Sequence, residues 1–221
     1  MQTLVDLLTR FSFLAAMPAV AGILITAGLL VVSRDWRLNV IALTLQYFFV
    51  VLLLTRLIRP EVAAVKGLIG WMICMVFYLT ERRASVLEQS SAAEGTVPSR
   101  RWRRWVMSAR ASFCLFAGIL VSVAAYTAVL RVPLPEVPAD VTLACYLLAG
   151  LGLLLIGLSE APMQVGLGLL TFLSGFDLFY VALEPSLAVA GLLGAVSFLI
   201  ALATAHLRVA QVVAGGEVKT P

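Results

Sequence analysis

The residues best placed to do chemistry in this chain are polar side chains inside long apolar runs. Asp177 is the clearest, because it lies within residues 169–183 between Phe176 and Leu178. A carboxylate at membrane depth costs about 2.5–3.5 kcal/mol on insertion scales, so it should face a partner or water. Ser174 precedes it by three residues, on the same face of a helix. We expect Asp177 to handle protons or to pair with a partner; the structural alternative is a snorkelling or hydrogen-bonded aspartate.

Two further polar side chains belong to other apolar runs. Gln46 sits amid Leu45 and Tyr47, and an amide in hydrocarbon seeks an interhelical hydrogen bond worth about 0.6–2 kcal/mol. We therefore interpret Gln46 as a residue that holds helices together. Lys66 lies one helical turn inside the outer end of its run, close enough to extend its ammonium group outward to water. A pairing of Lys66 with Asp177 is the alternative, and the sequence alone does not choose between the two.

The constellations typical of soluble enzymes are absent from the sequence. It has no HExxH, Walker, GxSxG or GxGxxG motif and a single histidine, His206. Three cysteines lie far apart in apolar runs without a CxxC pair, and we interpret them as small buried hydrophobic residues. We interpret His206 as an interface residue near a helix C-terminus, with a ligand or proton-relay role as the alternative. No catalytic residue, metal site or cofactor is predicted. Haem bound between helices normally needs a pair of histidine ligands, so haem is not expected either.

The composition indicates what kind of protein positions these side chains. The chain has 221 residues, of which 62% are hydrophobic and only 13% charged, whereas soluble domains carry about 25% charged residues. This surplus of apolar residues predicts an integral membrane protein of all-α class. Continuous apolar runs of the length of a membrane span indicate seven transmembrane helices, at residues 11–32, 38–55, 62–80, 111–130, 141–158, 161–183 and 186–207. The first run is longer than the apolar part of a signal peptide, so we expect it to be retained.

Positive charge predicts the orientation of these spans. Of the 16 lysines and arginines, eleven fall on one side of the predicted membrane and five on the other. The positive-inside rule places the larger group in the cytoplasm, which predicts a multi-pass protein of the cell inner membrane with its N-terminus outside and its C-terminus inside. Arg100, Arg101, Arg103 and Arg104 cluster in the longest connection. We interpret them as a topology anchor; binding of anionic lipid or docking of a peripheral partner are the alternatives, and nucleic acid is not expected.

An internal repeat is the last pattern. An offset of 124 residues aligns Gly28 with Gly152, and the pair Gly67 and Gly70 with Gly191 and Gly194. The alignment predicts two three-helix units in the same orientation, within residues 1–80 and 131–208. Between them lie a basic cytoplasmic loop at 81–110 and a linker helix at 111–130, and a cytoplasmic tail follows at 209–221. A leucine-rich chain also produces such matches by chance, so the duplication is a hypothesis.

Short stretches of the chain resemble a known family. The charged turn Ser33-Arg34-Asp35-Trp36-Arg37-Leu38 leads into a span that carries Gln46 near its middle. This three-helix unit with its N-terminus outside resembles subunit K of bacterial respiratory complex I, called chain 4L in mitochondria. The doubled, seven-span form resembles component E of hydrogenase-4, and the stretch Leu173-Ser174-Gly175-Phe176-Asp177-Leu178 is similar to the middle helix of that component's second unit.

The resemblance implies a function, but this chain lacks residues that the family uses for it. In that family the middle helices carry membrane-embedded glutamates on a proton path, whereas the matching positions here, near Leu170 and Leu173, are apolar and Asp177 is displaced by about one turn. The third-helix carboxylate is missing from residues 191–207. The resemblance therefore implies a non-catalytic subunit that packs between the larger subunits of a complex I-like or hydrogenase-like proton-translocating assembly. The partners it implies are antiporter-like membrane subunits and a peripheral redox arm, with no cofactor in this chain.

Two other functions fit the sequence. A stand-alone transporter of a small solute or ion would need a water-accessible cavity that reaches Asp177. A membrane scaffold would recruit a cytosolic partner through the Arg100–Arg104 cluster. A membrane-embedded enzyme acting on lipid has no nucleophile–base pair to support it.

Overall fold

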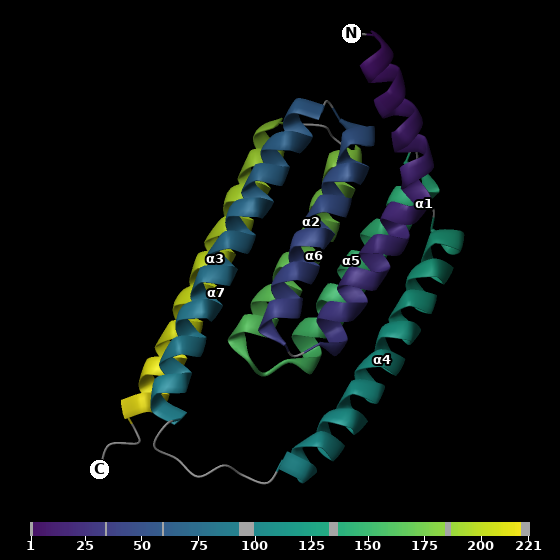
Figure 1. Ribbon diagram of the computed structural model, residues 1–221. Helices are drawn as coiled ribbons and strands as arrows, with labels where there is room; N and C mark the ends of the chain where they lie inside the picture. Colours follow the sequence, from purple (N-terminus) through teal and green to yellow (C-terminus); the bar gives the residue numbers. More distant parts are fainter. Residues whose placement is uncertain are drawn as a thin grey trace.

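The residues described by the computed structural model form seven α-helices (Figure 1). The structure describes the backbone of residues 2–33, 35–58, 60–92, 100–132, 137–183 and 187–217, and the side chains of residues 17–33, 35–58, 62–86, 111–132, 137–183 and 188–214. The helices are α1 (Gln2–Val32), α2 (Trp36–Leu57), α3 (Pro60–Ala92), α4 (Arg100–Arg131), α5 (Ala139–Leu158), α6 (Pro162–Leu183) and α7 (Leu187–Glu217). This confirms the predicted all-helical class.

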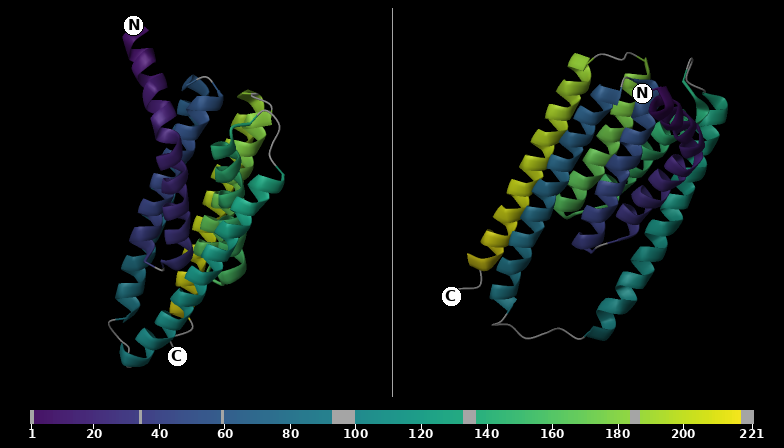
Figure 2. Two further views of the ribbon diagram at one scale, coloured as in Figure 1. Left: turned by 90° about the vertical axis from the view of Figure 1, so that its right-hand side faces the viewer. Right: turned by 45° about the horizontal axis from the view of Figure 1, so that its top comes forward.

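The helices form two layers with one helix at the edge. Helices α1, α2 and α3 make the first layer, and α5, α6 and α7 make the second (Figures 1 and 2). Between the layers α1 packs on α5, α2 on α6 and α3 on α7, while α4 packs on α5 and α1. Successive helices run in opposite directions, so each of these three interlayer pairs is parallel. We call the end with the N-terminus and the α2–α3 and α6–α7 connections the upper end, and the opposite one the lower end.

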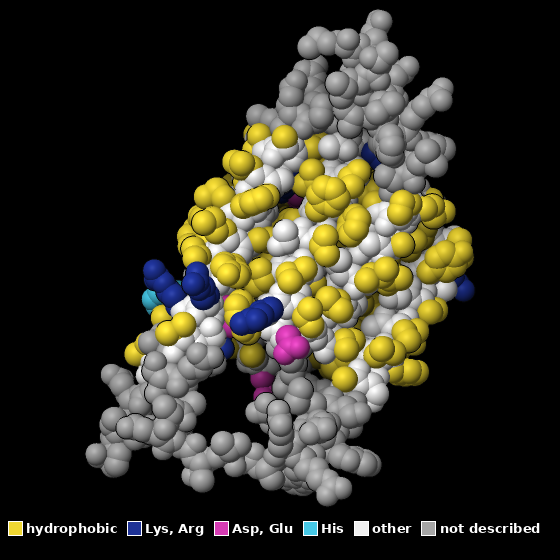
Figure 3. All heavy atoms as spheres, viewed as in Figure 1, with side chains coloured by type: hydrophobic (Ala, Val, Ile, Leu, Met, Phe, Trp, Pro, Cys, Tyr) yellow, Lys and Arg dark blue, Asp and Glu magenta, His cyan; other side chains and the backbone are white. Residues whose placement is uncertain are grey.

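The helices have the length and composition of membrane spans. Six of them contain apolar stretches of 20 to 27 residues, and about 20 residues suffice to cross the hydrocarbon of a bilayer. The seventh apolar stretch, Met17–Val32 of α1, is shorter within the residues whose side chains are described. Hydrophobic side chains cover most of the described surface in Figure 3. The fold is therefore that of a membrane protein, with six helices long enough to span.

Proline and short polar turns decide where several helices begin. Pro60 and Pro162 are the first residues of α3 and α6, and Pro138 immediately precedes α5. Proline suits these positions because its missing N–H would have no partner in the first turn. Before α2, the Asp35 backbone N–H donates to Ser33 Oγ at 3.3 Å, and Asp35 takes the extended conformation of an N-cap.

Three helices are longer than the apolar runs that predicted them. Helix α3 continues to Ala92, α4 already starts at Arg100, and α7 extends to Glu217. Residues 81–92 and 100–110, which we expected in a basic loop, are thus helical, as are residues 209–217 of the expected tail. The sequence of 81–92 contains neither glycine nor proline, and charged residues such as arginine and glutamate are good helix formers. Helix α3 therefore extends beyond the end of its apolar run.

Glycine allows α5 and α6 to approach each other closely. A Cβ atom built on Gly152 would lie 2.5 Å from the backbone nitrogen of Phe172, and one built on Gly175 would lie 2.9 Å from that of Ala149. Backbone atoms cannot move aside as the end of a long side chain can. Small residues at helix contacts are the usual device for close packing in membranes, and here they fix α6 firmly on α5.

Candidate functional site

The centre of the candidate site is an ion pair between the two layers. Lys66 Nζ on α3 lies 2.6 Å from Asp177 Oδ2 on α6, and the two side chains are only 12% and 7% exposed. Each residue is six positions from the upper end of its helix, which corresponds to a depth of about 9 Å. The Lys66 side chain therefore turns inward to a carboxylate instead of extending outward to water. The pairing that the sequence left open is formed.

A small cavity adjoins this ion pair. Its volume is about 20 Å³, and it lies where α2, α3, α6 and α7 meet. Besides Lys66 and Asp177, its lining includes the hydroxyl-bearing residues Tyr47, Ser174 and Ser197. A space of this size holds about one water molecule. The described residues therefore leave room beside the ion pair for about one water molecule.

Two buried oxygen atoms at this cavity have no regular hydrogen bond among the described residues. They are Asp177 Oδ1 and Tyr47 Oη. The Tyr47 hydroxyl lies near Ser174, whose Oγ donates to the Leu170 carbonyl at 2.8 Å and can still accept a hydrogen bond. Buried polar atoms are normally paired with protein or with ordered water. Both oxygen atoms belong to residues that line the cavity.

The electrostatics of the pair limit what it can do. One lysine and one aspartate together carry no net charge, whereas either group alone would be an uncompensated charge in a poorly hydrated region. Chemically the arrangement can hold α3 against α6, or it can exchange a proton between Lys66 and Asp177. The first role needs only the observed geometry. The second would need a route for the proton beyond the pair.

Two more ion pairs join the layers, one toward each end. At the upper end Arg56 Nη1 on α2 lies 2.9 Å from Asp140 Oδ2 on α5. Toward the lower end Arg208 Nε on α7 lies 3.1 Å from Glu81 Oε1 on α3, and the Glu81 side chain is 5% exposed. All three ion pairs among the described side chains connect the first layer to the second.

The sequence interpretation missed the two outer pairs and Tyr47. The four charged residues stand at or just beyond the ends of apolar runs, where charge normally marks the membrane surface. The sequence around Glu81 indicates that this residue is helical, because it directly follows the run 62–80 in a stretch with no helix breaker. Nothing in the sequence indicates a special role for Tyr47, since aromatic residues are common within apolar runs.

Gln46 does not belong to the polar cluster around Asp177. It is 1% exposed, yet it is not among the residues that line the cavity. Its Oε1 atom accepts no hydrogen bond within the described part of the chain. The structure thus brings Lys66, Asp177 and Ser174 together and leaves Gln46 apart from them, buried elsewhere on α2.

The remaining candidates lie away from the cluster. His206 is exposed on α7, while Cys74, Cys114 and Cys145 are buried and free. Among the residues whose side chains are described, no group of three or more histidines, cysteines or carboxylates could hold a metal ion. The side chains of Arg100, Arg101, Arg103 and Arg104 fall outside the described residues.

Comparison of the chain with protein-family models, with curated proteins and with solved structures finds no match.

Proposed function

We propose that this chain is a seven-span, non-catalytic membrane subunit of a redox-driven, proton-translocating assembly of the complex I or hydrogenase type. The observation that carries the proposal is the pairing of α1 with α5, α2 with α6 and α3 with α7 (Figures 1 and 2). A duplicated three-helix unit would place its equivalent helices face to face and parallel in this way, with α4 as the linker between the copies. This layout is the one that the resemblance to hydrogenase-4 component E implies.

The positions equivalent to the charged pairs support the duplication. Under the offset of 124 residues, Lys66 and Asp177 correspond to Ala190 and Leu53, which belong to one buried cluster. Glu81 and Arg208 correspond in the same way to Ala205 and Ala84, which are both buried. Two of the three ion pairs therefore have a buried apolar counterpart. A duplication followed by divergence would leave this pattern, with a charged pair in one place and an apolar pair in its equivalent.

The interior of the bundle favours a packing role over a proton path. Leu170 is fully buried and Leu173 lines the small cavity, at positions where the resemblance implies glutamates. Asp177 is committed through Oδ2 to Lys66. We propose that the chain stabilises contacts between antiporter-like membrane subunits and the part of the assembly that carries the redox arm, and that it holds no cofactor itself.

The geometry favours this role over a stand-alone transporter. A transporter would need water or solute to reach Asp177, but the cavity beside that residue holds about one water molecule. The scaffold alternative depends on the Arg100–Arg104 cluster, and the described side chains give it no specific support.

The proposed orientation places the lower end in the cytoplasm of a cell with an inner membrane. Described basic residues at that end include Arg37, Arg82, Arg83 and Arg208, against Arg56 and Arg131 at the upper end and Lys66 below it. This asymmetry follows the positive-inside rule, and it leaves the C-terminus inside and the N-terminus outside.

Extraction from the native membrane tests the proposal. The tagged chain is solubilised in a mild detergent, separated by native electrophoresis, and its co-migrating proteins are identified by mass spectrometry. We expect antiporter-like membrane subunits together with an iron–sulfur or nickel–iron arm, in fixed stoichiometry. Migration as a lone monomer or homodimer from the same membranes would contradict the proposal.

A further inference from the structure

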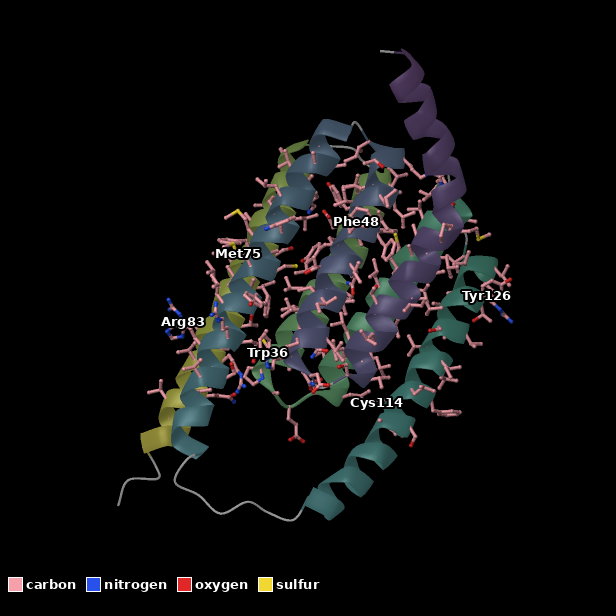
Figure 4. All side chains as sticks on the ribbon, viewed as in Figure 1. Trp36, Phe48, Met75, Arg83, Cys114 and Tyr126 are labelled. Atoms are coloured by element: carbon pink, nitrogen blue, oxygen red, sulfur yellow. The ribbon has the colours of Figure 1, made fainter. Side chains whose placement is uncertain are left out.

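A groove at the lower end of the first layer combines basic, aromatic and apolar side chains. It lies between the first turns of α2 and the stretch of α3 that faces them, and its volume is about 540 Å³. Trp36, at the lower end of α2 in Figure 4, marks its position. The lining residues are Trp36, Arg37, Val40, Ile41, Tyr78, Arg82, Ser85 and Val86.

The basic end of the groove is built from two helices. Arg37 of α2 lies over the Trp36 ring, with its guanidinium carbon 5.3 Å from the ring centroid. Trp36 in turn lies 6.2 Å from the Tyr78 ring of α3, and Arg82 stands one turn further along α3. The cation–π contact orients Arg37 without neutralising its charge. Two guanidinium groups therefore share one groove, and arginine is well suited to bidentate binding of phosphate.

Beyond Arg37, the α2 wall of the groove is apolar. Val40 and Ile41 follow one turn after Arg37, and Ile41 is 55% exposed. Tryptophan and tyrosine are enriched at the level of lipid headgroups. Trp36 begins the apolar stretch of α2, and Tyr78 lies beside it. A free phosphate would use the arginines but would leave this apolar wall without a partner.

We propose that this groove binds one anionic phospholipid. Its phosphate lies between Arg37 and Arg82, and one acyl chain lies along Val40 and Ile41. Among the described side chains, the acidic residues next in sequence to the groove lining are Asp35, which is exposed to water, and Glu81, which is paired with Arg208. The lining itself holds Arg37 and Arg82 and no carboxylate. This site is separate from the Lys66–Asp177 pair and does not depend on the proposed function.

Lipid binding to the full-length chain in neutral detergent tests the site. The probe is phosphatidylglycerol, counted per protein by native mass spectrometry, with phosphatidylcholine of the same chains as the zwitterionic comparison. The double variant Arg37→Gln/Arg82→Gln removes the proposed contacts. Arg83→Gln/Arg131→Gln removes the same charge outside the groove, since Arg83 points away from it in Figure 4 and Arg131 ends α4 at the upper end.

We expect the groove variant to bind phosphatidylglycerol roughly 30-fold more weakly, because each basic residue contributes about one decade or somewhat less near an anionic lipid. The control variant should stay within about twofold of the wild type, and wild-type protein should prefer phosphatidylglycerol over phosphatidylcholine. Excess glycerol phosphate should not displace the lipid. The variant Arg37→Lys/Arg82→Lys should regain part of the binding, which separates loss of the site from loss of the fold.

Three results would overturn the proposal. The first is equal binding of both phospholipids by the wild type, which needs no variant. The second is an equal effect of the groove and control variants, which would reduce the interaction to net charge. The third is full displacement by glycerol phosphate, which would leave an anion site without a lipid.

Discussion

Lys66 on α3 and Asp177 on α6 form a buried ion pair that ties the first layer of the bundle to the second. Their atoms are 2.6 Å apart and both side chains are almost fully covered. In lipid, apolar contacts between helices compete with equally apolar acyl chains, so the hydrophobic effect alone does not fix how two layers meet. A buried ion pair does fix the relative position of the two layers, because any other register would leave each charge without a partner. We interpret the pair as the contact that sets the register of α3 on α6.

Breaking this pair from either side should destabilise the bundle strongly. Asp177→Asn and Lys66→Met should each lower the free energy of unfolding by about 3–5 kcal/mol, because each leaves one buried charge unpaired. The double variant Lys66→Met/Asp177→Asn should recover most of that loss. The measurement is unfolding in mixed micelles of denaturing and mild detergent. Losses that simply add in the double variant would show that the two side chains do not depend on each other.

The two outer pairs should differ in strength according to their burial. Glu81 is 5% exposed and Asp140 is 21% exposed in their respective ion pairs. Glu81→Gln should therefore cost about 1–3 kcal/mol, whereas Asp140→Asn should cost about 1 kcal/mol or less. The same mixed-micelle titration compares them, at low and at high salt. An equal cost for both, or a larger salt effect on Glu81 than on Asp140, would contradict this order.

The α5–α6 contact should be intolerant of a single added methyl group. Gly152→Ala places a Cβ against the backbone of Phe172, and such overpacking typically costs about 1–3 kcal/mol. Gly157→Ala on the same helix is the matched control, because a Cβ there meets nothing within 4 Å and alanine favours the helix. Thermal unfolding in detergent should separate the two variants. If both leave the midpoint unchanged, the close approach of α5 and α6 is not maintained.

The sequence was sufficient to predict the helices and one member of the central pair. Apolar runs of span length predicted all seven helices, and Asp177 stood out because a carboxylate rarely occurs in such a run. Its partner could not be derived in the same way. Whether Lys66 turns outward or inward depends on how α3 is rotated about its axis, and that rotation follows from its packing on α2 and α7.

Two other features could not be predicted from the sequence, each for a different physical reason. The apolar run does not predict the extent of α3 past residue 80, because loss of apolar character marks the end of a membrane span, whereas a helix ends at a breaker or a cap. Gln46 is buried on α2 as an amide in an apolar run predicts, and its proposed interhelical hydrogen bond stays a prediction for the amide nitrogen, because only Oε1 is without a partner among the described side chains. An amide in an apolar run indicates burial without indicating which neighbour it meets.

Proton flux through the purified chain tests the central claim, that the Lys66–Asp177 pair joins the layers and does not conduct. The protein is reconstituted in liposomes that contain a pH-sensitive dye, and a potassium gradient with valinomycin drives protons inward. Wild-type and Asp177→Asn proteoliposomes should acidify no faster than protein-free liposomes, while an added uncoupler acidifies all three. Acidification by the wild type that Asp177→Asn abolishes would contradict the account and assign the pair to a proton path.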